Sequence, residues 1–144
     1  MSKMYLRYLE EKRQMIEAVH QTSALAAGSQ GALERTAEKA RIAALPTPVR
    51  SYLEMAGFKE GQLPKTAEVI WKESRIKLGP DKPWMALHTL QCNTAIPPAR
   101  IAYMSTKMLG ILPFEGRDLY AGGRGHMLGK IAGLVTVFDD ASEA

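Results

Sequence analysis

The sequence predicts an α+β protein in which N-terminal helices are followed by a curved antiparallel β-meander of five or six strands. Three observations predict this class. Apolar residues recur at helical spacing over the first 22 residues, apolar and polar residues alternate from about residue 66 onward, and turn residues separate the alternating runs at short intervals. Short turns leave no room for crossover helices, so neighbouring strands are expected to be antiparallel.

Two helices are expected in a helical N-terminal extension, residues 1–44. Over residues 2–22 apolar side chains recur every three or four positions, as on one face of a helix, and Ser2 stands where an N-cap residue is favoured. Small residues and glycines at 23–31 predict a linker. An alanine-rich run at 32–44 predicts a second helix that packs lightly.

A short helix is expected within residues 45–57, because residues suited to both of its ends are present. Thr47 stands at the N-cap position and Pro48 at the first helical position, where its missing N–H is tolerated. Gly57 can adopt the left-handed conformation that ends many helices. This helix opens the main α+β domain, which is predicted to span residues 45–138.

The strands are expected as alternating runs between turn residues. A phase shift near residues 72–74 predicts a β-bulge, and Gly122 with Gly123 predicts a two-residue hairpin turn. Residues 131–138 predict either a sixth strand or a buried helical turn, and residues 139–144 predict an acidic tail. The other strands are expected at residues 66–78, 84–95, 99–108, 114–121 and 124–130.

Composition indicates one globular domain and argues against several function classes. The 144 residues have a net charge of +4, with nine basic and seven acidic residues in 1–60 and ten and eight in 61–144. Because the basic residues are not clustered, no nucleic-acid partner is predicted. No run approaches the ~20 apolar residues of a membrane span, and the N-terminus lacks a signal-peptide pattern. The single cysteine, Cys92, fits a reducing compartment, so a cytoplasmic location is predicted.

No catalytic, metal-binding or cofactor-binding motif is recognisable. The three histidines, His20, His88 and His126, show no metal-ligand spacing, and no G-x-S-x-G occurs. Cys92 follows His88 by four residues, which on a strand separates them by roughly 13 Å, too far for a nucleophile and its base. No catalytic residue, metal or cofactor is therefore predicted.

Four motifs occur in order along the second part of the chain. They are LPxPVRxYLxxAG from Leu45, KPWM from Lys82, the pair Pro97 and Pro98, and GRGxMLxKxxGL from Gly123. With these motifs, roughly residues 45–140 resemble a bacterial family known as a domain of unknown function. The resemblance implies an α+β fold with a curved antiparallel sheet, and it implies no reaction and no catalytic residue.

Members of that family continue past the Gly133–Leu134 region with further strands. The resemblance therefore implies that this chain is either a short or a truncated version. In either case the edge of the last strand is expected to be exposed unless another segment or another chain pairs with it. We expect a homodimer that pairs through the sheet edge or through the N-terminal helix.

The leading functional hypothesis is a non-enzymatic protein that binds a small apolar or lipid-like ligand. Apolar side chains of the sheet, including Ile101, Met108 and Met127, could form a cup under the helices, and eight methionines suit an adaptable pocket. The alternative is that these side chains simply fill the core. The predicted ligand-binding residues are Trp71, Trp84, His88, Leu90, Met104, Phe114, Arg124 and His126.

Two further hypotheses remain open. One is an enzyme with a polar site at Asp118, Arg124 and His126 near the glycine turn. The other is a structural or interaction protein that docks through its N-terminal helix. Clustering of the three polar side chains in a cleft would favour the enzyme.

Overall fold

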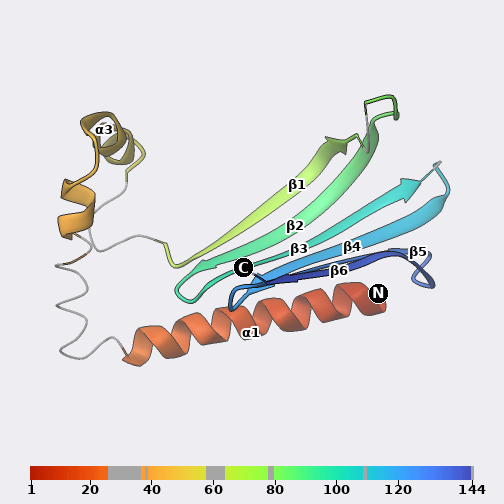
Figure 1. The fold of residues 1–144 in the computed structure, drawn as a ribbon, viewed down its shortest axis with the longest axis horizontal. Coiled ribbons are helices and arrows are strands. Elements are labelled where there is room, and N and C mark those ends of the chain that lie inside the picture. The colour runs from red at the N-terminus through yellow and green to blue at the C-terminus, as the bar shows by residue number, and fades with distance from the viewer. Residues whose placement is uncertain (26–36, 38, 58–63, 78–79, 109, 144) are drawn as a thin grey trace.

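A long N-terminal helix lies against one face of an open six-stranded sheet in the computed structural model (Figure 1). The structure describes residues 1–25, 37, 39–57, 64–77, 80–108 and 110–143. All neighbouring strands are antiparallel and follow chain order, β1-β2-β3-β4-β5-β6. The elements are α1 (Lys3–Leu25), α3 (Thr47–Met55), β1 (Thr66–Ile76), β2 (Met85–Ala95), β3 (Pro98–Met108), β4 (Leu112–Ala121), β5 (Arg124–Ile131) and β6 (Val135–Glu143).

Helix α1 begins with the predicted cap and buries one apolar stripe. The Ser2 hydroxyl accepts a hydrogen bond from the Tyr5 backbone N–H at 3.1 Å. Further along, the buried residues Met4, Tyr8 and Met15 recur at helical spacing. The helix lies across β2, β3 and β4.

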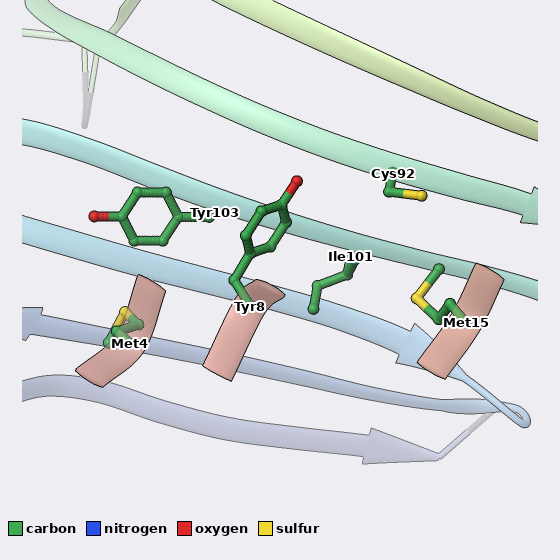
Figure 2. Packing of buried hydrophobic residues seen from close by; sticks show 6 residues of the cluster. All are labelled: Met4, Tyr8, Met15, Cys92, Ile101 and Tyr103. Carbon is green, nitrogen blue, oxygen red and sulfur yellow. The ribbon is translucent and has the colours of Figure 1, made fainter. Parts of the chain in front are cut away.

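The core forms where this stripe meets the middle strands. Figure 2 shows Met4, Tyr8 and Met15 of the helix beside Cys92, Ile101 and Tyr103 of the sheet. Cys92 and Ile101 pair across β2 and β3 and are completely buried. The rings of Tyr5 and Tyr103 meet edge to face, with centroids 5.1 Å apart.

The second face of the sheet has no helix packed on it among the described residues. Successive strand residues alternate between faces, so Met104 and Phe114 lie on the face opposite α1. Phe138 joins them there, and its ring centroid lies 6.1 Å from that of Phe114. Helix α3 buries none of its residues, and Figure 1 draws it beyond the end of the sheet.

The predicted fold class is confirmed, including most of its turn features. The bulge lies between Trp71 and Ser74. Gly122 and Gly123 form the β4–β5 turn with φ of 59° and 76°. Gly57 is left-handed as expected, with φ of 79°.

Several element boundaries differ from the prediction. Helix α3 begins at Thr47 with Pro46 at the N-cap position, so Thr47 does not cap it and no side chain does. Residues 131–138 include the start of the sixth strand, which is the first of the two predicted alternatives, but β6 continues to Glu143, so the expected acidic tail belongs to the sheet up to that residue. Its carboxylates are tolerated because β6 is an edge strand with access to water on its outer side.

The remaining expectations concern the N-terminal extension and the domain limits. Residues 39–43 are helical, whereas 26–36 and 38, which hold most of the predicted linker and second helix, lie outside the described residues. The division into an extension and a main domain stays a prediction. No helix in the described part of the chain is long and apolar enough to cross a membrane.

Candidate functional site

A groove opens where the N-terminal end of α1 passes over β3, β4 and β5. Its volume is about 760 Å³. The residues that line it are Ser2, Lys3, Met4, Arg7, Tyr103, Ser105, Thr106, Lys107, Pro113, Phe114, Glu115, Leu128, Lys130, Ala132 and Gly133. We call it the α1 groove.

The α1 groove combines apolar surface with positive charge. Met4, Pro113 and Leu128 contribute apolar side chains. Among the described residues, no carboxylate lies within 4.0 Å of the ammonium groups of its lysines, whereas Arg7 pairs with Glu11 at 3.0 Å. The lysines in question are Lys3, Lys107 and Lys130.

Among the described residues that line the groove, Glu115 is the one acidic side chain. Its Oε1 accepts hydrogen bonds from the hydroxyl groups of Ser2 and Tyr103. The hydrogen bond from Ser2 joins the residue before α1 directly to β4. It therefore holds the N-terminal end of the helix next to the strand at the groove. The pKa of Tyr103 is raised to about 12, mainly by burial and secondly by the hydrogen bond that its hydroxyl group donates to Glu115.

A buried charge network lies beside the groove under the middle of α1. Arg117 of β4 is completely buried and donates two hydrogen bonds to the Glu11 carboxylate, at 2.5 and 2.6 Å. Its Nη1 lies 2.9 Å from Nδ1 of His126, and Nε2 of His126 lies 2.7 Å from the Asp139 carboxylate. These contacts join α1, β4, β5 and β6, and they leave no described buried side-chain polar atom without a partner.

Cys92 and His88 lie apart on β2. Cys92 is fully buried, and burial raises the pKa of its thiol above the ordinary value, which makes the reactive thiolate scarce. His88 is half-buried, pairs in register with Ser105, and lines a second hollow of about 610 Å³. That the two residues form no catalytic pair stays a prediction.

The eight predicted ligand-binding residues do not line one cavity. Strand alternation places His88, Leu90, Arg124 and His126 on the face toward α1, and Trp71, Met104 and Phe114 on the opposite face. Trp84 precedes β2 and is 64% exposed. Of the eight, His88 lines the second hollow, and Phe114 borders the α1 groove near the start of β4 although strand alternation assigns it to the opposite face.

The three residues of the predicted polar site are also separated. Asp118 pairs in register with Met127 and forms an ion pair with Arg100 on the face away from α1. Arg124 and His126 face the other way, where their acidic partners belong to β6. The cluster that would favour the enzyme hypothesis is therefore not formed, because a shift of one residue along a strand reverses the side chain's face.

Sequence reasoning missed the residues that define this region. Glu11 lies on the same helix face as the buried positions 4, 8 and 15, three residues after position 8 and four before position 15. This spacing could have indicated from the sequence that its carboxylate faces the sheet. Arg117 alternates in phase with Leu119 on the core side of β4. The three groove lysines come from different elements, so only the tertiary structure brings them together.

The class of this protein is an open antiparallel meander. In the part of the chain that the structure describes, one long helix covers one face of the meander, and a basic, partly apolar groove lies at the N-terminal end of that helix. A family model described as "Family of unknown function (DUF6544)" matches residues 35–144. The chain belongs to this family, which confirms the predicted resemblance to a domain of unknown function. No curated protein and no solved structure matches the chain.

Proposed function

We propose that this protein binds a small apolar or lipid-like ligand in the α1 groove and does not act as an enzyme. The observation that carries the proposal is the groove itself, about 760 Å³ in volume with Met4, Pro113 and Leu128 among its lining residues. Small-molecule sites typically measure about 300–1,000 Å³ and combine apolar walls with a few polar groups.

The lining suits an adaptable apolar guest. Met4 is unbranched and can adjust its shape, while Tyr103 presents a ring held in place by packing on Tyr5 and by its bond to Glu115. The proposed ligand site is therefore smaller than the wide cup expected from the sequence and is placed at one end of the covered face.

The enzyme alternative has no comparable support, because Asp118 lies on the opposite face from Arg124 and His126. Docking through the N-terminal helix is limited by the fact that its apolar stripe already packs on the sheet. The cytoplasmic location stays a prediction.

We further propose that two copies associate through a sheet edge. Both β1 and β6 have a neighbour on one side only in the described sheet. On β6, Val135 and Val137 are 61% and 50% exposed. Exposed edges with β-branched residues favour pairing with another strand.

The ligand proposal is tested with a neutral apolar fluorophore, N-phenylnaphthylamine, titrated into the full chain. We expect saturable binding that is lost in Ser105→Trp, because the indole would fill the groove next to Glu115. Ser51→Trp, on the exposed surface of α3, is the matched control and should bind as the unaltered protein does. Absence of saturable binding, or equal binding by both variants, would contradict the proposal.

A further inference from the structure

The second hollow adjoins the α1 groove at the ends of β2 and β3. Its volume is about 610 Å³, and it shares Ser105, Thr106 and Lys107 with the groove. The groove and the hollow are adjacent along the β2–β3 strand pair. Leu90 pairs with Tyr103 under the helix, and His88 pairs with Ser105 two residues further along the same two strands. A ligand in the groove can therefore extend past Ser105 without leaving the protein surface.

We propose that this hollow receives an anionic head group, so that the ligand is an amphiphile with an apolar tail in the α1 groove and a phosphate or carboxylate in the hollow. The proposal rests on the proposed function and adds the chemical class of the ligand. The basic residues Lys72, Arg75 and Lys107 line the hollow together with His88, and Glu73 is the one acidic residue among the described part of its lining.

The pairing pattern of the strand cations supports this assignment. Seven basic side chains lie on the described strands. Three of them, Arg100, Arg117 and Arg124, form ion pairs with carboxylates of the chain. The other four have no carboxylate within 4.0 Å in the described part of the chain, and all of them line the hollow or the groove: Lys72, Arg75, Lys107 and Lys130.

The chemistry of these groups suits an oxyanion. A guanidinium such as that of Arg75 can donate two parallel hydrogen bonds to a phosphate or carboxylate, and neighbouring ammonium groups add attraction without strict geometry. Lys107 belongs to both cavities, so it stands where the head and the tail of such a ligand would join.

Three amphiphiles with the same dodecyl tail test the proposal: dodecyl phosphate, dodecanoate and dodecanol. Each is used below its micelle-forming concentration to displace the neutral fluorophore from the full chain. We expect at least one anion to bind about tenfold more tightly than dodecanol, as a single charge-assisted hydrogen bond would give. The tighter-binding of the two anions identifies the head group that the hollow prefers.

Arg75→Glu should remove the preference for the anion and leave dodecanol binding unchanged. Arg124→Glu is the matched control, since it makes the same charge change on an exposed strand residue outside both cavities. Lys107→Gln gives a second, milder variant in case the first does not fold.

The outcomes separate the two proposals. If dodecanol binds as tightly as both anions, or if Arg75→Glu and Arg124→Glu have equal effects, the head-group assignment is wrong and the groove remains a ligand site. If none of the three displaces the fluorophore, and the fluorophore itself does not bind, the proposed function fails as well.

Discussion

Arg117 is the residue through which helix α1 and the centre of the sheet are joined electrostatically. Its guanidinium is completely buried, and its charge is balanced by the Glu11 carboxylate. When the partner of a buried ion is removed, the attraction that offset the free-energy cost of burying the charge is lost. The pair thus favours the observed orientation of α1, in which Glu11 points toward Arg117.

We expect Arg117→Ala to lower the free energy of unfolding by about 3 kcal/mol, since Glu11 would lose its completely buried partner and keep only the ion pair with the more exposed Arg7. Urea unfolding followed by circular dichroism measures this. Arg124→Ala removes an exposed pair with Glu143 and should cost less than about 1 kcal/mol. Similar losses in the two variants would show that the buried pair does not contribute as argued.

Tyr103 links stability to alkaline pH. Burial raises its pKa, and that of Tyr8, to about 12 from an ordinary value of 10.0. Between about pH 10 and 12 the unfolded chain therefore releases phenolic protons that the folded chain retains. Unfolding is favoured as the pH rises through that window, and stability is unaffected by these groups below it.

The measurement is urea unfolding at a series of alkaline pH values, with tyrosinate absorbance recorded in parallel. Tyr103→Phe should lose less stability across the window than the unaltered chain, because one linked group is gone. Tyr52→Phe, on a side chain that is 61% exposed, should behave as the unaltered chain does. Parallel pH profiles for all three proteins would argue against the linkage.

At the level of elements, β5 and β6 are fitted together by a glycine and an aromatic ring. The ring of Phe138 lies over Gly129, so closely that a Cβ on the glycine would come within 3.0 Å of three ring atoms. Gly129 pairs in register with Phe138, which places the ring directly above its backbone. The missing side chain at position 129 is therefore a steric requirement of this strand pair.

Gly129→Ala is expected to destabilise the fold by about 1–2 kcal/mol through overpacking. Combining it with Phe138→Ala should remove most of that extra cost, since the clash disappears. Thermal unfolding of the two single variants and the double variant completes the cycle. Additive losses would mean that the ring moves aside and that the contact imposes no strain.

The strands were predictable because the second part of the chain alternates regularly and is divided by glycine and proline turns. Sheet order also followed, as short turns allow only neighbouring antiparallel pairs. The extent of β6 did not follow, because Asp139 and Asp140 are poor strand residues and are accepted here at an edge, where Asp139 meets His126.

The candidate site was much less predictable. Its cations come from β1, β3, β5 and α1. Their grouping depends on where the N-terminal end of α1 lies over the sheet. Alternation does assign a face to each strand residue once the register is known. Without that register, Asp118 and His126 could not be assigned to opposite faces.

For the whole molecule, the proposed dimer predicts a light-scattering mass of twice the 15.9 kDa chain at micromolar concentration. Val137→Lys should shift the mass toward one chain, since a lysine on an edge strand opposes pairing with another strand. Val49→Lys, on the 42% exposed surface of α3, should leave the mass unchanged. A single-chain mass for the unaltered protein would rule out edge pairing.

The position of α1 over the middle of the sheet also determines how the molecule opens transiently. The helix covers β2, β3 and β4, so the outer strands β1 and β6 are held mainly by their own ladders. Opening events should therefore begin at both margins and reach β3 last. Deuterium uptake by backbone amides of the single-chain Val137→Lys variant would record this gradient, with the slowest uptake around Ile101 and the fastest in β1 and β6.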